Sequence, residues 1–225
     1  MSDAFAACEE DVRRHDPDRY YAALFAPEGK RRHLFALYAL YRELAHAALV
    51  AREPMILDIR LAWWRETIEG ARTGAPRDHH VAQALAVVLS ENALPNEPFA
   101  RIIEARAGEG AGFADAAAAE AHADATAGSL MRLAARVLGG EADAAAREAG
   151  IAYALAGRSD ARLSGIDAAA LARRHFEAAR AIPLPRAILP AFLAAALVPL
   201  YLRRPDPPVW RRQVLLYQAA VRGGL

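Results

Sequence analysis

The sequence predicts an all-α protein, and three observations support that prediction. Alanine and leucine dominate while β-branched residues are few, and alanine and leucine lose little conformational freedom on entering a helix. Apolar residues recur at spacings of three and four, the period of one helix face. Proline and glycine fall between these periodic runs. The 225 residues are expected to form a single domain, residues 1–225.

Proline and glycine breaks divide the chain into a series of helical segments. Their expected bounds are 3–15, 18–25, 30–52, 55–73, 81–90, 97–106, 113–138, 142–156, 168–180, 187–202 and 209–222. Asn96 and Asp167 have the residue type and position of helix N-caps. In the longest early helix, residues 30–52, one apolar stripe is expected to be buried, and in residues 55–73 Ile59 is expected to share a face with Trp63.

The most apolar stretch is Ala187–Leu202, which Pro190 and Pro199 interrupt. It is shorter than the roughly 20 apolar residues that cross a bilayer, so no transmembrane segment is expected. We interpret it as a buried core helix. Docking on a membrane surface is the alternative, because Arg203 and Arg204 follow the stretch where a basic rim would lie.

Charge and cysteine content exclude several functional classes. The 28 basic and 27 acidic residues leave a net charge of +1, which provides no strong field for nucleic acid. Cys8 is the single cysteine, so no intrachain disulfide can form, and Glu9 and Glu10 beside it disfavour a reactive thiolate. Residues 1–10 lack the pattern of a secretory signal. We expect a cytoplasmic protein, with contact to the periphery of the inner membrane left open.

Several segments resemble the squalene/phytoene synthase family in the same order along the chain. The strongest are Asp18–Pro27 (DRYYAALFAP), Arg32–Glu43 (RHLFALYALYRE) and Ile59–Glu66 (IRLAWWRE). Weaker ones are Thr126–Met131 (TAGSLM) and Ala149–Ala152 (AGIA). The resemblance implies a helical bundle of the isoprenoid synthase type. It also implies the family's reaction, in which two prenyl diphosphates are joined head to head.

That reaction requires magnesium ions held by two aspartate-rich motifs, with acids at i and i+4 on one helix face. The first motif should follow Arg42, but the aligned positions are Ala45, His46 and Leu49, and Glu43 is the only carboxylate in the body of that helix. Without its acids, this segment is a degenerate motif comprising Arg42, Glu43 and His46.

The second motif is also degenerate in the sequence. Its aligned glutamine and asparagine positions are Ala154 and Gly157, and no acid lies four residues from Asp160. The resemblance therefore predicts that ionisation of a prenyl diphosphate lacks its main electrostatic support. We expect no catalytic residues and no cofactor.

One other acid pair has helical metal-ligand spacing, Glu120 and Asp124. His122 between them points away from their shared line, and a polar stripe on an alanine-rich helix is usually a solvated face. This pair is retained only as the magnesium site of an alternative, a prenyltransferase with an altered metal site. His79 and His80 are adjacent and lack a third ligand at i+4, so we interpret them as a surface loop.

Residues 60–66 contain the densest group of tryptophan and arginine, which are frequent at binding hot spots. The candidate interaction patch comprises Arg60, Trp63, Trp64, Arg65 and Glu66. A structural interpretation is also open, in which one tryptophan is in the core and the other covers the helix surface.

The leading functional hypothesis is a non-catalytic binding or assembly protein. The segment Arg42–Ala45 (RELA) resembles a degenerate branch of the family that includes a mitochondrial respiratory complex I assembly factor. A protein partner or a bound prenyl lipid is expected under this hypothesis.

Overall fold

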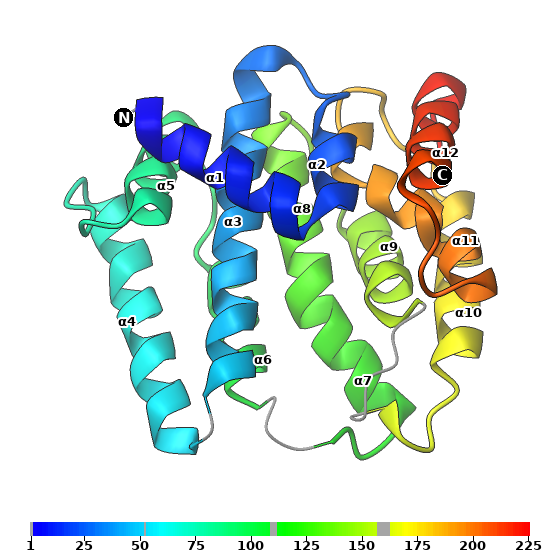
Figure 1. Ribbon diagram of the computed structural model, residues 1–225, viewed down its shortest axis with the longest axis horizontal. Coiled ribbons are helices and arrows are strands. Elements are labelled where there is room, and N and C mark those ends of the chain that lie inside the picture. Colours follow the sequence, from blue (N-terminus) through cyan, green and yellow to red (C-terminus); the bar gives the residue numbers. More distant parts are fainter. Residues whose placement is uncertain (1, 52, 109–111, 157–162) are drawn as a thin grey trace.

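The computed structural model describes residues 2–51, 53–108, 112–156 and 163–225. Every regular element in these ranges is helical, so the all-α prediction is confirmed (Figure 1). The α-helices are α1 (Ser2–His15), α2 (Pro17–Ala23), α3 (Glu28–Val50), α4 (Pro54–Arg72), α5 (His80–Glu91), α6 (Glu97–Ala107), α7 (Ala116–Ala123), α8 (Ser129–Val137), α9 (Asp143–Leu155), α10 (Ala168–Ala181), α11 (Val198–Arg203) and α12 (Val209–Arg222). A π-helical segment, η1 (Asp124–Gly128), joins α7 to α8, and short 3-10 turns η3 (Leu189–Ala191) and η4 (Leu193–Leu197) precede α11.

Asp167 and Asn96 were predicted to be helix N-caps, and both predictions can be compared with the structure. Asp167 caps α10, because its carboxylate accepts a hydrogen bond from the Ala170 N–H at 2.9 Å. Asn96 occupies the N-cap position of α6 as predicted, but its side chain does not cap the helix. Its backbone is already helical, with φ −73° and ψ −32°, and its side chain makes no cap hydrogen bond to α6.

Helix α3 is the centre of the bundle. Its residues 33–40 are buried around the whole circumference, not along a single stripe. In Figure 1, α1 crosses α3 at an angle, α4 and α5 lie on one side of it, and α8 to α12 lie on the other. A helix surrounded in this way has to be apolar on every face.

The predicted helix 113–138 is interrupted. Helix α7 starts at Ala116, where the Asp115 carboxylate accepts from the Ala118 N–H at 2.8 Å, and the π segment then widens one turn before α8. The end of that turn, Gly128, lies against Gly150 of α9. A Cβ atom at Gly150 would lie 2.5 Å from the Gly128 nitrogen and 2.6 Å from its Cα. The two helices are therefore in backbone contact, which only glycine permits there.

The apolar stretch Ala187–Leu202 is internal for most of its length. Ile188, Phe192, Leu193 and Leu197 are at most 1% exposed. The core interpretation is therefore correct, although the stretch forms short 3-10 turns before α11 in place of one regular helix. Most of the side chains that this stretch would present to a membrane pack inside the protein instead. Among the described residues, no helix combines the length and apolar character that a bilayer span requires.

Replacement of Gly150 by alanine tests the backbone contact. We expect the Gly150→Ala protein to lose about 1–3 kcal/mol of unfolding free energy, because the new methyl group forces the α9 and η1 backbones apart. Gly29→Ala is the matched control. A Cβ at Gly29 meets no atom within 4 Å, so this helical substitution should be neutral or slightly stabilising. Urea unfolding measures both, and equal effects would contradict the packing argument.

The reactivity of the Cys8 thiol gives an independent measure of global unfolding. Its side chain is 0% exposed, and burial, followed by the charges of Asp11 and Glu43, raises its pKa to about 12. We expect the native thiol to be unreactive toward a disulfide reagent at pH 8, with the rate rising to that of a free thiol as urea unfolds the chain. Rapid labelling of the folded protein would contradict this burial.

Candidate functional site

An open pocket of about 390 Å³ lies where α2, α3, α9 and α11 meet. We call it the central pocket. Its lining residues are His15, Asp16, Pro17, Asp18, Arg19, Tyr41, Arg42, Ala45, His46, Leu49, Tyr153, Ala156, Tyr201 and Pro205. The residues come from both ends of the chain, so the pocket exists only in the folded bundle.

The α3 wall of the central pocket includes residues of the segment that the sequence predicts to be a degenerate first motif. Arg42, Ala45, His46 and Leu49 share one helix face because they are three and four residues apart, and all four line the pocket. Arg42 binds Asp11 of α1 with two hydrogen bonds, from Nε at 2.9 Å and from Nη2 at 3.2 Å. Glu43 projects from another side of α3 and lines a neighbouring pocket. Of the three predicted residues, Arg42 and His46 line the central pocket and Glu43 does not.

The opposite wall contains Asp18, which the sequence analysis did not single out. This carboxylate is 5% exposed and accepts three hydrogen bonds from distant elements. The donors are the Tyr153 hydroxyl of α9 at 2.9 Å, the Tyr201 hydroxyl of α11 at 2.5 Å and the Arg212 Nη1 of α12 at 2.9 Å. Burial and the Asp18 charge raise the pKa of Tyr201, so its hydroxyl remains a proton donor.

Arg19 is the second buried charge of the pocket. Its Nη1 donates to Asp16 Oδ2 at 2.6 Å, and its guanidinium lies 5.0 Å from the ring centroids of both Tyr41 and Tyr153. Burial would lower the pKa of Arg19, but the Asp16 carboxylate and the two tyrosines outweigh it and raise the pKa above its usual range. Arg19 therefore stays charged and is fixed between two rings.

These contacts pair the charges of the central pocket internally. Asp16 is bound by Arg19, Asp18 by Arg212, and Arg42 by Asp11. A metal ion at the pocket would have to compete with arginine for each of these carboxylates. Sequence spacing gave no signal for this arrangement, because Asp18 and its partners are more than 130 residues apart.

The second predicted motif is only partly described. Ala154 lies on α9 and is half-buried, whereas Gly157 and Asp160 lie outside the described residues. Ala156, at the C-terminal end of α9, lines the central pocket. The segment that aligns with the start of the second motif therefore reaches the central pocket at Ala156, whose side chain is a methyl group.

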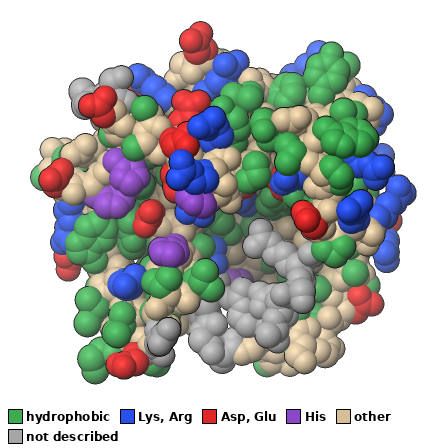
Figure 2. All heavy atoms as spheres, in the orientation of Figure 1, with side chains coloured by type: hydrophobic (Ala, Val, Ile, Leu, Met, Phe, Trp, Pro, Cys, Tyr) green, Lys and Arg blue, Asp and Glu red, His purple; other side chains and the backbone are tan. Residues whose placement is uncertain are grey.

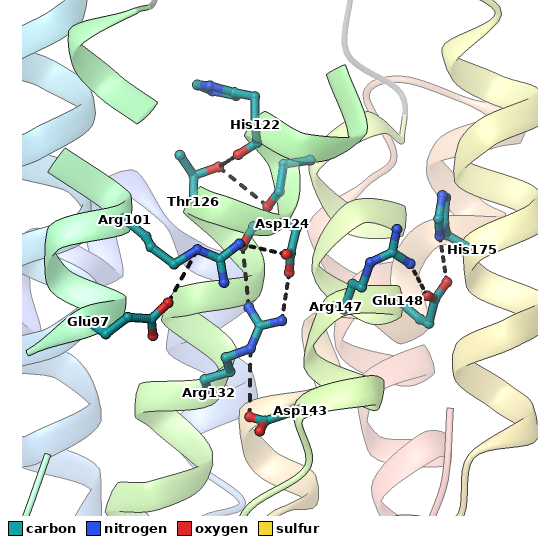
Figure 3. Close-up of polar contacts among 11 residues, drawn as sticks. Glu97, Arg101, His122, Asp124, Thr126, Arg132, Asp143, Arg147, Glu148 and His175 are labelled. Atoms are coloured by element: carbon teal, nitrogen blue, oxygen red, sulfur yellow. Dashed lines mark hydrogen bonds and ion pairs between the residues drawn. The ribbon is translucent and has the colours of Figure 1, made fainter. Parts of the chain in front are cut away.

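Glu120 and Asp124 lie one helical turn apart, since the Asp124 N–H donates to the Glu120 carbonyl, but their carboxylates bind different cations. Asp124 lies 2.7 Å from Arg101 and 2.8 Å from Arg132, and in Figure 3 it sits between these two arginines while His122 points away. Burial would raise the pKa of Asp124, but the two arginines lower it below its usual value.

Glu120 is engaged by another helix, α10. It pairs with Arg174 and lies 3.4 Å from His175 Nε2. The two acids thus face different cations from different helices. In the described part of the chain, no three histidine, cysteine, aspartate or glutamate side chains are grouped as metal ligands.

The candidate patch of residues 60–66 divides between two surfaces. Trp64 is buried, Trp63 is half-buried, and their rings meet edge to face at 4.8 Å. With Arg60 they line a second pocket of about 360 Å³, which includes Glu43 and His46. Arg65 and Glu66 instead line a groove of about 490 Å³ between α4 and α6.

His79 is also part of the tryptophan cluster. Its ring lies 5.3 Å from Trp64, and its Nδ1 accepts a hydrogen bond from the Val81 N–H at 3.2 Å. Burial, with His80 beside it, lowers the pKa of His79. His79 lies in the loop before α5, as interpreted, but it is half-buried, and its ring packs on both tryptophans and caps α5.

The largest exposed apolar side chains near the central pocket lie where α3 ends and α4 begins. We call this surface the α3–α4 tip, comprising Leu49, Val50, Met55, Ile56 and Ile59. Leu49 is 83% exposed, Met55 71% and Ile59 63%. The expectation that Ile59 and Trp63 share a helix face is confirmed, since both line the second pocket, although Ile59 is largely exposed and Trp63 is half-buried.

Removal of the Asp18 carboxylate tests the buried network. We expect Asp18→Ala to lower the unfolding free energy by about 3 kcal/mol, because Arg212 and two tyrosine hydroxyls lose a common partner inside the protein. Glu10→Ala is the control. It removes exposed ion pairs to Arg13 and Arg14, which solvent screens, and should cost far less than the Asp18 substitution. Similar losses for the two proteins would contradict the role given to Asp18.

Comparisons with known proteins agree with this architecture. Sequence comparison with curated proteins gives no match. A dehydrosqualene synthase crystallised with a ligand superposes with a TM-score of 0.74 at 17% identity, covering 98% of this chain and 96% of that one. The squalene synthase HpnC from Alicyclobacillus acidocaldarius superposes with a TM-score of 0.69 at 18% identity, covering 98% and 94%. The family model for squalene/phytoene synthase matches residues 12–161, and the chain therefore belongs to the squalene/phytoene synthase family.

Proposed function

We propose that this chain is a non-catalytic member of its family that acts as a binding or assembly protein. The observation that supports this most directly is the α3 wall of the central pocket. Where the family resemblance places paired acids, the pocket lining has Ala45, His46 and Leu49. These side chains offer no carboxylate to a magnesium ion, which prefers oxygen ligands.

The paired charges of the pocket support the same proposal. A diphosphate needs cations that are available to it, but Arg19 is committed to Asp16, and Arg42 to Asp11. Each such pair would have to be broken before the arginine could bind a phosphate, at a cost that is large for the buried Arg19. The pocket is therefore poorly suited to ionise a prenyl diphosphate.

The α3–α4 tip supports a protein partner. Its apolar side chains are bordered by exposed Glu53, Asp58 and Arg60, so an apolar centre has a polar rim of both signs, as in many protein interfaces. Leu49 belongs to both the tip and the central pocket. A partner at the tip would cover the mouth of the pocket. We propose this role in line with the resemblance to the branch that includes a respiratory complex I assembly factor.

Two alternatives have less support. A prenyl lipid would find few aliphatic walls, because tyrosine and charged side chains make up much of the central pocket lining. A prenyltransferase with its metal on Glu120 and Asp124 would first have to displace Arg174 from one acid, and Arg101 and Arg132 from the other.

Titration of the purified chain with farnesyl diphosphate, with and without magnesium, tests the proposal. Heat reports binding and a coupled assay reports pyrophosphate. We expect no magnesium-dependent release of pyrophosphate. Release above that of buffer would refute the non-catalytic proposal, and binding without release would support a prenyl-lipid role over a purely protein partner.

A variant can restore the missing acids. Ala45→Asp with Leu49→Asp places two carboxylates at i and i+4 on the pocket wall. We expect this protein to bind farnesyl diphosphate more tightly when magnesium is added, by about tenfold or more. Leu49→Asp alone is the matched control, since a single acid should leave the magnesium effect small. If the double variant behaves like the control, the absence of acids on α3 does not support the proposed lack of activity.

A further inference from the structure

The last helix carries an apolar stripe that the bundle leaves uncovered. Trp210, Val214, Tyr217 and Val221 of α12 are four, three and four residues apart and therefore lie on one helix face. Their exposed fractions lie between 45% and 62%, whereas Leu216 and Ala219 on the other side are buried. We call these four residues the α12 stripe. It lies outside the central pocket and outside the α3–α4 tip.

Arginines border this stripe, and acids are nearly absent from its surroundings. Helix α12 contains Arg211, Arg212 and Arg222 and no carboxylate. Residues 178–225 include seven of the 28 basic residues of the chain but only one of its 27 acidic residues, Asp206. The near-zero net charge of the whole chain thus conceals a basic C-terminal region. Figure 2 shows basic and hydrophobic side chains side by side at the upper right, over α12.

Three arginines also surround a hollow beside the stripe. Arg180, Arg203 and Arg222 line a pocket of about 280 Å³ whose other walls include Phe176, Leu200 and Leu215. Arg180 donates to the Leu225 carbonyl at 3.2 Å. Within the described residues, no acid pairs with Arg203 or Arg222. An anionic group with an apolar tail would match both the charge and the walls of this hollow.

We infer that α12 docks on the surface of an anionic lipid membrane. The α12 stripe enters the headgroup region, where tryptophan and tyrosine are favoured because their rings are apolar and carry one polar group. Arg203, Arg211 and Arg222 contact lipid phosphates along the border of the stripe. A helix with an apolar face and a basic border is the usual form of an interfacial anchor.

Charge argues against other occupants of this face. A second copy of the chain would bring arginines of one α12 against arginines of the other, which is unfavourable in an isologous contact. Nucleic acid would leave Val214 and Val221 without apolar contacts. The α3–α4 tip is a poorer membrane site, because Glu53 and Asp58 oppose an anionic surface, and it lies at the other end of the bundle from α12 (Figure 1).

Co-sedimentation of the full chain with vesicles tests the inference. We expect binding to vesicles of phosphatidylcholine with 30% phosphatidylglycerol at low salt, and weak binding to pure phosphatidylcholine. Arg211→Gln with Arg222→Gln should lower the affinity by about fivefold for each arginine, and added salt should have a similar effect. Arg212 is left intact because it binds Asp18.

Matched double variants locate the contact. Val214→Glu with Val221→Glu places acids within the stripe and should reduce binding to the mixed vesicles by at least tenfold. Met55→Glu with Ile59→Glu places two acids on the α3–α4 tip, whose side chains are also exposed, and should leave vesicle binding unchanged. Circular dichroism and thermal unfolding check that both proteins fold.

Three results would overturn the inference. The first is an absence of binding to the mixed vesicles at low salt. The second is an equal loss of binding in the two double variants. The third is dimerisation of the chain through α12 without vesicle binding. The farnesyl diphosphate titration is independent of this face, so failure here would leave the proposed non-catalytic role untouched.

Discussion

The Asp18 carboxylate joins four helices that the chain reaches at widely separated points. Through Tyr153, Tyr201 and Arg212 it connects α2 to α9, α11 and α12. A buried carboxylate with three donors is well compensated, whereas the same group without them would be costly. This network closes the N-terminal and C-terminal parts of the chain around the central pocket. It also fixes the rotation of α12, because Arg212 faces inward and the α12 stripe consequently faces outward.

Pairing between opposite charges also determines the electrostatics of the central pocket. Arg19 is bound by Asp16 at the N-cap of α2 and Arg42 by Asp11 of α1, so both arginines are already paired within the protein. At Asp124, Arg101 and Arg132 neutralise an acid in the same way. The family bundle is retained by apolar packing around α3 and by the backbone contact of Gly128 with Gly150. Neither of these depends on the magnesium-binding acids.

Local sequence signals accounted for much of the helical fold and for part of the candidate site. Helix bounds were predicted to within a few residues wherever proline, glycine or a capping aspartate marks them, as at Asp167. The π segment was missed because residues 113–138 are helical by every local measure, and the widened turn reflects packing against α9. The different cation partners of Glu120 and Asp124 and the exposure of Ile59 were missed for a similar reason. Helical spacing shows which residues share a face, but not what lies opposite that face.

The sequence by itself determined the helical class, the family resemblance and the apolar residues Ala45 and Leu49 on α3, because periodicity, punctuation and residue identity are local properties. Only the tertiary structure decided that Asp18 is the central buried charge, that Ala187–Leu202 is internal, and that Trp210 and Tyr217 are exposed. These outcomes depend on which surfaces meet. Contact between residues 18 and 212 is specified by the packing of the whole bundle, and no local pattern encodes it.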